Sequence, residues 1–358
     1  GPDSNWRPLG YEPNELPTAP PRDIIGSAKM HVSFRKNKYL CRNYSCLSFF
    51  KAVFTFISMT PEHKAGFISI IGKPNVGKST LMNALVGERL SIVSSKAQTT
   101  RHRILGMLNG EHKGTEYQIV YSDTPGVLLP KYELHKSMMQ FVKSSLEDAD
   151  VVLYVTDVFD EFEDLDFLTN WKDFTETPIL VLLNKIDLVT MEKLEEKVAY
   201  WQGIFPGRPI IPISALESVH LDQIFSHLME HLPVHPPFFD KDELTDKPEK
   251  FFASEIVREK IFMNYKKEIP YSCEVVVTSF KEEPTILRIA TEIYVERVSQ
   301  RAIIIGHKGE NIKKVGMQAR EDLEKFFGKK VFLEQFVKVE PDWRAKTDKL
   351  RSFGYSLD

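Results

Sequence analysis

Residues 72–79 read Gly-Lys-Pro-Asn-Val-Gly-Lys-Ser, directly after the apolar run Phe-Ile-Ser-Ile-Ile at 67–71. The next residues, 80–85, read Thr-Leu-Met-Asn-Ala-Leu, a composition typical of a helix. A strand, a glycine-rich loop and a helix in this order form a cradle for phosphate groups. A glycine turn between a core strand and a core helix is the alternative, and the motifs that follow disfavour it.

Each residue type in this loop suits the binding of phosphates. Gly72 and Gly77 let backbone N–H groups converge on phosphate oxygens at a helix N-terminus. Lys78 can reach the β and γ phosphates, and the Ser79 hydroxyl can ligate Mg²⁺. The chain is therefore predicted to bind a nucleoside triphosphate. The predicted nucleotide-binding residues of the loop are Asn75, Val76, Gly77, Lys78, Ser79 and Thr80.

Composition sets outer limits on the fold. A chain of 358 residues that is 42% hydrophobic has room for about two domains with buried cores. The net charge of −3 is small, so any surface for nucleic acid must be local. Three cysteines, Cys41, Cys46 and Cys273, make neither a disulfide framework nor a metal quartet. The sequence lacks a long uncharged apolar run, so we expect no membrane-spanning helix.

The chain divides into five segments. Residues 1–58, of which 24–58 carry basic but no acidic residues, are expected to be a disordered leader or a non-native extension, with a transit peptide as the alternative. A nucleotide domain is predicted at 60–232 and a Pro-rich linker at 233–248. A second domain is predicted at 249–340 and a tail at 341–358.

Apolar strands alternate with amphipathic helices through the first domain, which predicts a mostly parallel sheet with helices on both faces. The further predicted strands are Tyr117–Ser122, Val151–Thr156, Ile179–Asn184 and Ile210–Ile213. The predicted helices are Leu134–Glu147, Met191–Trp201 and Leu221–His231.

The second domain is predicted to have the element order α-β-β-α-α-β. The helices are expected at 249–265, 301–305 and 311–327, and the strands at 271–280, 286–297 and 331–339. In the second of these strands the apolar residues Ile286, Ile289, Ile293 and Val295 alternate imperfectly, so its register is left open.

Two further motifs complete the predicted nucleotide site, and the second indicates which base is bound. Asp123-Thr-Pro-Gly126 follows a predicted strand, where Asp123 can hold Mg²⁺ through water and the Gly126 N–H is available to the γ-phosphate. Asp187 ends the run Asn184-Lys185-Ile-Asp at the carboxyl edge of the sheet. Its carboxylate can accept both the N1–H and the amino group of guanine, a donor pair that adenine lacks. The sequence therefore predicts GTP rather than ATP.

The remaining predicted contacts to the base come from the two loops at that edge. Asn184 is expected to brace the loops, and the stem of Lys185 to lie along the base. After the strand Ile210–Ile213, the triplet Ser214-Ala215-Leu216 places the Ala215 N–H for the guanine O6.

The polar stretch 94–103 has no apolar face to pack, so we expect a mobile switch that a threonine hydroxyl orders by joining Mg²⁺. Thr100 is the first candidate and Thr99 the second. In Ras-like GTPases a glutamine after the Asp-x-x-Gly element orients water; here Val127 stands there, which predicts slow intrinsic hydrolysis. Asn75 has two possible roles: its side chain could bind a K⁺ ion that stabilises the transition state, or it could simply form a hydrogen bond with its own backbone.

These motifs, the Lys96-Ala-Gln-Thr-Thr-Arg-His-Arg103 stretch and the ending Leu350-Arg-Ser-Phe-Gly-Tyr355 together resemble the Era GTPases. The similarity covers about 64–355. It implies a C-terminal type II KH domain that binds 16S rRNA near its 3′ end and a role in assembly of the 30S subunit. It also implies GTP, GDP and Mg²⁺ as ligands and a cytoplasmic location, with peripheral association with the inner membrane. We expect a monomer.

The residues 301–351 support RNA binding independently, because 13 basic residues there outnumber 8 acidic ones. Gly306 and Gly309 form a Gly-x-x-Gly loop between two predicted helices, which KH domains use to grip single-stranded backbone. The isoleucines before the loop would offer an apolar floor for unstacked bases. The predicted RNA-binding residues are Ile305, Gly306, His307, Lys308, Gly309, Lys313 and Lys314.

Two alternative functions stay open. The first is an RNA-binding scaffold with an inert nucleotide domain, against which Lys78, Ser79, Thr100 and Asp123 all argue. The second is a tRNA-modifying GTPase, a family with a reactive cysteine near the C-terminus. This chain ends without one, and Cys273 lies in a predicted strand where a core role is expected.

Overall fold

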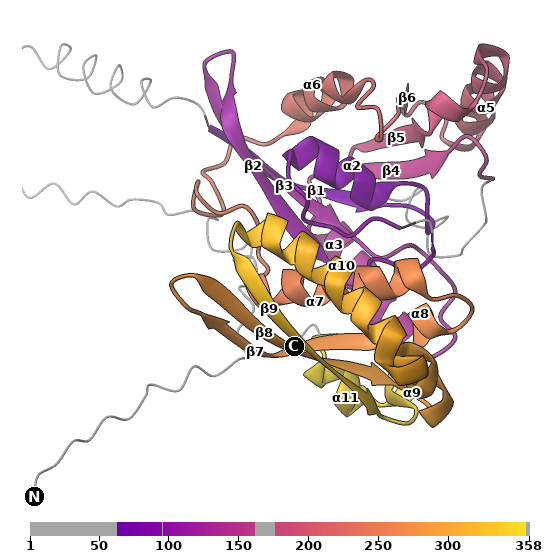
Figure 1. Ribbon diagram of the computed structural model, residues 1–358. Helices are drawn as coiled ribbons and strands as arrows, with labels where there is room; N and C mark the ends of the chain where they lie inside the picture. The colour runs from indigo at the N-terminus through magenta and orange to yellow at the C-terminus, as the bar shows by residue number, and fades with distance from the viewer. Residues whose placement is uncertain (1–62, 95, 162–175, 356–358) are drawn as a thin grey trace, which may run out of the picture. The chain divides into compact units, whose positions relative to one another are not determined.

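The computed structural model describes residues 63–94, 96–161 and 176–355 (Figure 1). The predictions made for residues 1–58 lie outside the described residues. Within the described ranges, the helices are all too short or too polar to cross a membrane.

The first sheet contains six of the described strands in the order β2-β3-β1-β4-β5-β6 (Figure 1). All neighbours are parallel except β2 and β3. The sequence analysis missed β2 because its second half is polar and exposed. The strands are β1 (His63–Ile71), β2 (Ile104–His112), β3 (Thr115–Asp123), β4 (Val151–Asp157), β5 (Ile179–Asn184) and β6 (Ile210–Pro212).

Helices cover both faces of this sheet, because its central strands are apolar on both sides. All seven residues of β4 are buried, which is typical of a central parallel strand. The helices are α2 (Lys78–Val86), α3 (Glu133–Glu147), α5 (Met191–Ile204) and α6 (Leu221–His231), with a 3₁₀ turn η2 (Ile186–Leu188). The predicted fold class of this part is confirmed.

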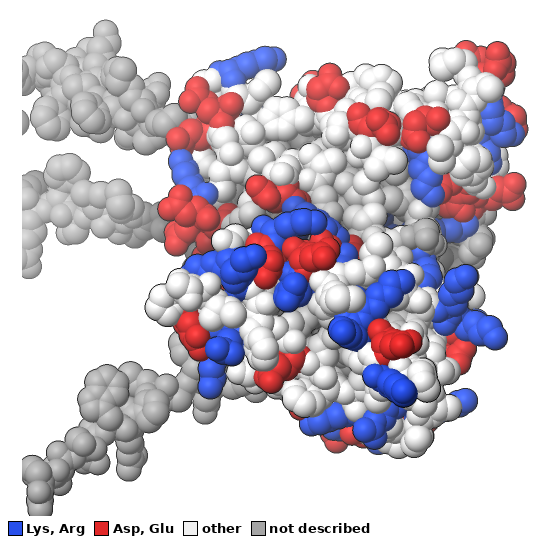
Figure 2. All heavy atoms as spheres, in the orientation of Figure 1, with Lys and Arg blue, Asp and Glu red and all other residues white. Residues whose placement is uncertain are grey.

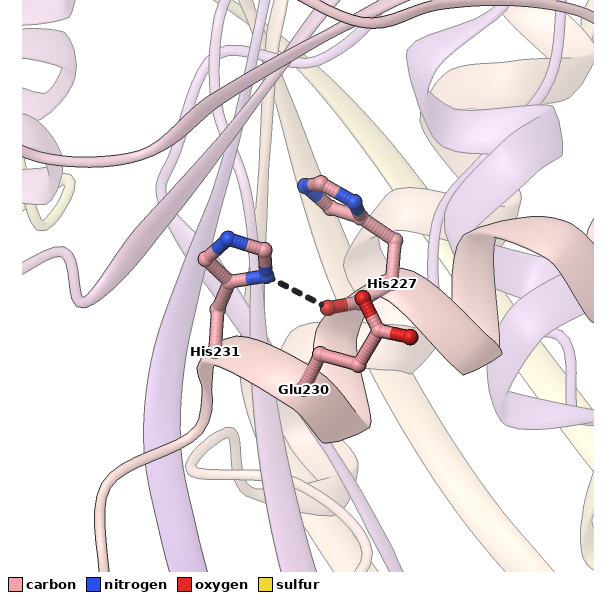
Figure 3. Close-up of side chains that lie close together, drawn as sticks. All are labelled: His227, Glu230 and His231. Atoms are coloured by element: carbon pink, nitrogen blue, oxygen red, sulfur yellow. Dashed lines mark hydrogen bonds between the residues drawn. The ribbon is translucent and has the colours of Figure 1, made fainter.

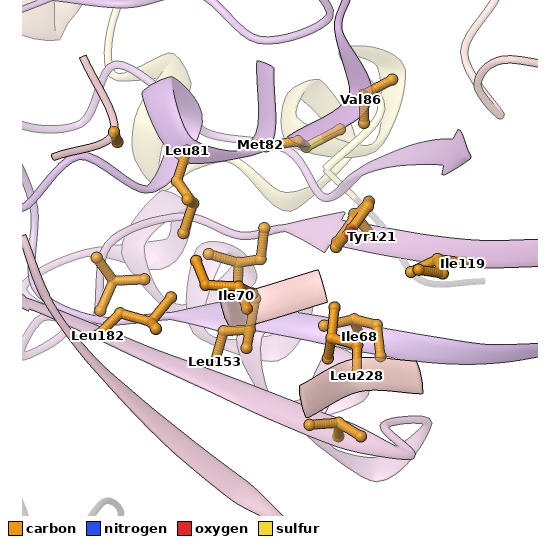
Figure 4. Close-up of a cluster of buried hydrophobic side chains, with 14 of the residues drawn as sticks. Ile68, Ile70, Leu81, Met82, Val86, Ile119, Tyr121, Leu153, Leu182 and Leu228 are labelled. Carbon is orange, nitrogen blue, oxygen red and sulfur yellow. The ribbon is translucent and has the colours of Figure 1, made fainter. Parts of the chain in front are cut away.

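Two hydrophobic clusters form the core on opposite faces. In the first, Leu81, Met82 and Val86 of α2 and Leu228 of α6 pack against strand residues such as Ile70 (Figure 4). The second joins β4 and β5 to α3 and α5 around the buried Trp201. The helices are thus packed against the strands whose carboxyl ends carry the predicted site residues.

A second sheet of three strands follows, in the order β7-β8-β9, with β7 antiparallel and β9 parallel to β8. Its predicted α-β-β-α-α-β order is confirmed, with one extra short helix. The elements are α7 (Glu249–Asn264), α8 (Ile269–Ser272), β7 (Glu274–Glu282), β8 (Ile286–Val295), α9 (Val298–Ile305), η3 (His307–Gly309), α10 (Glu310–Phe327) and β9 (Lys330–Val339).

The structure corrects two details of this part. Residues 269–272 form α8, so β7 begins at Glu274 and not at Tyr271. In β8 the buried residues alternate strictly from Leu287 to Val295, and Ile286 lies outside this set. The imperfect pattern in the sequence arose because the buried face includes a threonine, Thr291.

The predicted linker is packed along the first sheet. The N–H of Met107 donates to the carbonyl oxygen of Leu244 (2.9 Å), and the N–H of Leu105 donates to Asp246 (2.9 Å). Gln118 accepts the N–H groups of Phe238 and Phe239. The connection is therefore fixed to β2 and β3 at several points.

The predicted tail packs against α3. It contains η4 (Trp343–Ala345) and α11 (Thr347–Ser352). Trp343, Leu350 and Tyr355 form a buried cluster with Leu134 and Met138 of α3.

Candidate functional site

The phosphate-loop candidate lies between the end of β1 and the start of α2. Gly72 (φ 151°) and Gly77 (φ 101°) adopt backbone angles that other residues rarely take. A Cβ atom at Gly72 would lie 2.0 Å from the carbonyl oxygen of Val155, and one at Gly77 would lie 2.2 Å from the Asn184 amide nitrogen. Both positions therefore require glycine, and the free N–H groups at the start of α2 can bind an anion.

The three predicted metal-binding side chains lie together beside this loop. The Ser79 hydroxyl donates to Asp123 Oδ2 (2.7 Å), and Thr100 Oγ1 lies 2.8 Å from Ser79 Oγ. Since the single hydroxyl hydrogen of Ser79 is used on Asp123, Thr100 is the donor in the second bond. Thr99 instead donates to the carbonyl oxygen of Lys96 (2.6 Å). Of the two candidate threonines, Thr100 is the one that reaches the cluster.

This cluster fits Mg²⁺ by the chemistry of its donors. Asp123 Oδ1 is buried and, among the described residues, has no hydrogen-bond partner. Burial raises the pKa of the Asp123 carboxyl, against the hydrogen bond from Ser79 and the charge of Lys78. Two hydroxyl oxygens suit Mg²⁺ as direct ligands, and the free carboxylate oxygen beside them can accept a hydrogen bond from a metal-bound water.

Lys78 is held inside the loop it belongs to. Its ammonium donates to the carbonyl oxygens of Gly72 (3.1 Å) and Lys73 (2.7 Å), and the residue is 6% exposed. Burial lowers the pKa of Lys78 to about 8, although the Asp123 carboxylate acts against this shift. A phosphate group would supply the opposite charge that this ammonium lacks.

The predicted base-binding loops are tied to each other and to the phosphate loop. Asn184 Nδ2 donates to the carbonyl oxygen of Val76 (2.8 Å), and Asn184 Oδ1 accepts the N–H of Ala215 (2.9 Å). Asn184 thus makes the bracing contacts that the sequence predicted. The Ser214 hydroxyl donates to Asp187 Oδ1 (2.6 Å), which orients that carboxylate. Leu216 is 73% exposed, so little packing holds its side chain.

Lys185 pairs with a carboxylate that the sequence analysis did not name. Its ammonium lies 2.6 Å from Asp157 Oδ2, and its backbone is left-handed (φ 65°). Asp157 ends β4 directly beside Asn184 in β5. Asp157 could have been identified from the sequence, because it directly follows one predicted buried strand and the next predicted strand along the chain ends at Asn184, directly before Lys185.

The Asp-x-x-Gly element approaches the phosphate loop closely. A Cβ atom at Gly126 would lie 2.7 Å from Pro74, and the N–H of Val127 donates to the carbonyl oxygen of Gly72 (3.0 Å). Val127 is 3% exposed and belongs to the second core cluster. Its side chain is therefore a core group and cannot orient a water molecule. Asn75 is exposed with a left-handed backbone (φ 67°), which asparagine tolerates, so both readings of this residue stay open.

The expectation that residues 94–103 have nothing to pack against is wrong. Arg101 is fully buried and donates to the carbonyl oxygens of Pro270 (3.1 Å), Tyr271 (3.2 Å) and Cys273 (2.7 Å). It also forms an ion pair with Glu274 (2.9 Å). These partners belong to α8 and the start of β7, so the predicted switch is bound to the C-terminal part.

Three further contacts strengthen this attachment. Arg258 of α7 donates to the carbonyl oxygen of Thr99, and Lys96 donates to the carbonyl oxygen of Phe262. The His102 ring stacks on Tyr355 at 4.3 Å between centroids. The signal that could have revealed the attachment was the basic character of the segment, because buried carbonyl groups need donors.

The Gly-x-x-Gly loop connects α9 and α10. Gly306 (φ 73°) and Gly309 (φ 81°) have backbone angles that favour glycine. The Asn311 amide donates to the carbonyl oxygen of Ile303 (3.1 Å), and a Cβ atom at Gly306 would lie 2.6 Å from Asn311. The turn is therefore closed tightly under the exposed Lys308.

The predicted RNA contacts differ in exposure. His307, Lys308, Lys313 and Lys314 are exposed, Ile305 is partly buried, and Ile304 belongs to the core. On the face drawn in Figure 2, Lys and Arg side chains are numerous in the region of α9 and α10, whereas Asp and Glu are prominent near α5 and α6. The cationic surface is thus local, as the charge count over 301–351 predicts.

Family models match both parts of the chain. Residues 67–185 match the model described as 50S ribosome-binding GTPase, and residues 268–344 match the KH domain model. Several curated proteins are similar over most of their length. GTPase Era of Geotalea uraniireducens is 43% identical over 300 residues, which are 82% of this chain and 98% of that protein. GTPase Era of Staphylococcus epidermidis is 42% identical over 299 residues, 83% of this chain and 99% of that protein.

A relative from a plant is also similar. The chloroplastic ERA-like GTPase of Oryza sativa subsp. japonica is 44% identical over 302 residues, which are 82% of this chain and 70% of that protein.

Two solved structures share the fold of both parts. The crystal structure of Era with MgGDPNP and nucleotides 1506–1542 of 16S ribosomal RNA has a TM-score of 0.77 at 39% identity. A variant of Aquifex aeolicus Era bound to GDP·AlF₄⁻ has a TM-score of 0.77 at 40% identity. Each match covers 82% of this chain and 100% of the other.

Proposed function

The chain belongs to the Era GTPase family, and on that premise we propose that it is a GTP-hydrolysing switch that binds 16S rRNA near its 3′ end and assists assembly of the 30S ribosomal subunit. The observation that carries the proposal is the adjacency of Thr100 and Arg101. Thr100 belongs to the cluster at the phosphate loop, and Arg101 is buried in the C-terminal part.

We assign roles in the nucleotide site as follows. Ser79 and Thr100 would hold Mg²⁺ directly and Asp123 would hold it through water. When bound, the ion neutralises charge on the β- and γ-phosphate oxygens. Lys78 would bind the same phosphates, and Gly126 would donate its N–H to the γ-phosphate. Support for these roles comes from the hydrogen-bonded chain Thr100-Ser79-Asp123 and the buried free oxygen of Asp123.

Guanine recognition is assigned to Asp187, with Lys185 and Ala215 beside it. The Ser214 hydroxyl donates to Oδ1 of Asp187, which orients the carboxylate, and because each carboxylate oxygen has two lone pairs, both oxygens can still accept hydrogen bonds from the base. Slow intrinsic hydrolysis is proposed because Val127 is a core residue. Comparing single-turnover hydrolysis in K⁺ and in Na⁺ tests whether Asn75 takes part through a bound monovalent ion.

RNA binding is assigned to the loop 306–309 and the start of α10, in a KH domain spanning about 249–340. The experiment is binding of a single-stranded RNA with the 3′-end sequence of the small-subunit rRNA, using protein loaded with GDP or with a non-hydrolysable GTP analogue. We expect tighter binding in one nucleotide state and affinity that falls as salt rises. Equal binding in both states would favour the scaffold with an inert nucleotide domain.

A matched pair of variants tests the RNA surface. Replacing both Lys313 and Lys314 with Gln should weaken binding about equally for all RNA sequences and reduce the salt slope by roughly one per lysine. Replacing Lys325 with Gln on the same helix is the control, because Lys325 is exposed in the last turn of α10, away from the loop. Equal effects of the two changes would contradict the assignment.

A tRNA-modifying function is disfavoured by the state of Cys273. This thiol is fully buried, and burial raises its pKa to about 11. A buried thiol with a raised pKa is a poor nucleophile.

The cellular location belongs to the proposal as well. We place the protein in the cytoplasm where ribosomes are assembled, with peripheral contact with the inner membrane. Cell fractionation with a salt wash of the membranes tests that contact.

A further inference from the structure

The last turn of α6 carries three potential metal ligands that the proposed function does not use. His227, Glu230 and His231 each offer one ligand atom, and these three atoms lie within 4.8 Å of one another. Within the part of the chain that the structure describes, this is the one such group of three or more His, Cys, Asp or Glu side chains. Figure 3 shows the three side chains close together at this end of the helix.

The spacing explains the clustering. Residues at i, i+3 and i+4 lie on one face of a helix, so the two imidazoles and the carboxylate face the same volume. The rings of His227 and His231 have centroids 4.2 Å apart. Ligand atoms around Zn²⁺ lie about 3.4 Å apart in a tetrahedron with metal–nitrogen bonds of about 2.1 Å. Glu230 is exposed, so rotation of its side chain can close the remaining gap.

The hydrogen bonding of His231 prepares it as a ligand. Its Nδ1 lies 2.9 Å from the carbonyl oxygen of His227 (Figure 3), and only a protonated Nδ1 can donate to that oxygen. The Nε2 atom of the neutral ring therefore carries a free lone pair. Metal-bound histidines almost always have such a bond from the other ring nitrogen, because it fixes the tautomer and orients the ring.

A further feature favours a cation here. The site lies at the C-terminus of α6, where the last carbonyl groups carry partial negative charge.

We propose that His227, Glu230 and His231 form a binding site for a divalent transition-metal ion of the Zn²⁺ and Cu²⁺ class. Two imidazoles with one carboxylate suit these ions, whereas Mg²⁺ and Ca²⁺ prefer sites made of oxygen ligands alone. Three protein ligands leave a coordination position for water. The ion cross-links the last helical turn, directly before residue 233, where the connection to the C-terminal part begins.

The proposed metal site lies beside the start of the connection at residue 233, which is held to β1 by hydrogen bonds. Lys64 of β1 donates to the carbonyl oxygen of Met229 (2.7 Å), and the N–H of Ala65 donates to the carbonyl oxygen of Pro233 (3.2 Å). Metal binding should stiffen the end of a helix that is already tied to the start of β1, an interior strand of the first sheet.

The test is isothermal titration of the full chain with Zn²⁺, in the presence of saturating GDP and Mg²⁺ so that the nucleotide site is filled. The variant is His227→Gln with His231→Gln, and the matched control is His220→Asn. His220 is an exposed histidine at the other end of α6, and asparagine tolerates its left-handed backbone. We expect the double variant to lose one equivalent of zinc relative to the wild type, and the control to lose none.

Cysteines and histidines elsewhere in the chain can also bind zinc, so the comparison is the difference between variants. The electron paramagnetic resonance spectrum of one equivalent of Cu²⁺ gives a second measurement, since two imidazole ligands produce resolved nitrogen couplings. Glu230→Gln should keep these couplings and weaken zinc binding by about tenfold. An unchanged zinc stoichiometry and copper spectrum in the double variant would overturn the proposal.

Discussion

Glu274→Gln should release the switch segment from the C-terminal part while changing little in the shape of the side chain. The carboxylate is 4% exposed and accepts hydrogen bonds from Arg101 (2.9 Å) and from the Tyr355 hydroxyl (2.6 Å). Both donors bind the same oxygen, Oε2, so glutamine can keep these two hydrogen bonds at its single oxygen, but it removes the negative charge and turns its NH₂ group toward the N–H of Val275. Arg101 stays charged at every accessible pH, so its buried charge loses its counterion.

The expected loss of stability depends on the hydrogen bonds that Arg101 keeps in the variant. Breaking a buried ion pair from one side costs about 3–5 kcal/mol. Because Arg101 keeps three carbonyl acceptors, we expect the low end, about 3 kcal/mol, or roughly a 150-fold change in the equilibrium. Tyr355→Phe removes only one hydrogen bond and should cost about 1 kcal/mol. Glu133→Gln, which breaks an exposed pair with Lys136, should cost well under 1 kcal/mol.

The assay is urea unfolding of the full chain together with limited proteolysis of the segment 96–103. Two domains need not unfold in one step, so proteolysis reports on release of the switch separately from global unfolding. The double variant Arg101→Met with Glu274→Gln is the deciding control. Because it removes both charges, it should recover much of the loss. If the double variant is as unstable as the sum of the single changes, or Glu274→Gln protects the switch as well as the wild type, the reasoning is wrong.

Three other predictions concern selectivity and pH. Asp187→Asn should reduce the preference for GDP over ADP by about 2–3 kcal/mol, measured by nucleotide competition. The pKa of Lys78 is about 8 without nucleotide, and phosphates should raise it, so GDP affinity is nearly full at about pH 7 and falls as the pH rises through 8. Between pH 7 and 8.5 the loss should be about fourfold, and Lys78→Arg should flatten it, since arginine does not titrate there. Burial and the nearby cations hold the pKa of His102 well below its usual value, so the unfolded state takes up the proton first. Stability is therefore full above about pH 6.5 and falls below it; His102→Gln should reduce this slope in thermal unfolding.

The sequence predicted the parts of the fold that repeat local patterns. The central strands were found because continuous apolar runs such as 151–156 are typical of buried parallel strands. The loops that bind ligands follow from topology, since parallel strands present their carboxyl ends at one edge. Asp123, Asn184 and Ser214 were placed on neighbouring loops for this reason, and the structure puts them there.

The parts that were missed depend on contacts between distant segments. β2 has a polar exposed half, and only its pairing with β3 makes it a strand. The switch segment was expected to be free because its side chains are polar. Its basic side chains indicate a need for acceptors, but the acceptors are mostly backbone carbonyl groups about 170 residues away, and the sequence does not indicate which ones.

The attachment of the switch connects the nucleotide site to the C-terminal part, which carries the proposed RNA-binding loop. Thr100 and Arg101 are consecutive, so a change in the backbone that moves one hydroxyl from the Ser79 cluster also moves the guanidinium bound in the C-terminal part. If GTP changes the affinity for RNA by some factor, RNA must change the affinity for GTP by the same factor. We therefore expect any coupling to need no separate relay and to be lost when the pair of Arg101 and Glu274 is removed. A variant without this pair should bind GTP and RNA each at near-normal affinity, yet each ligand should no longer affect the other.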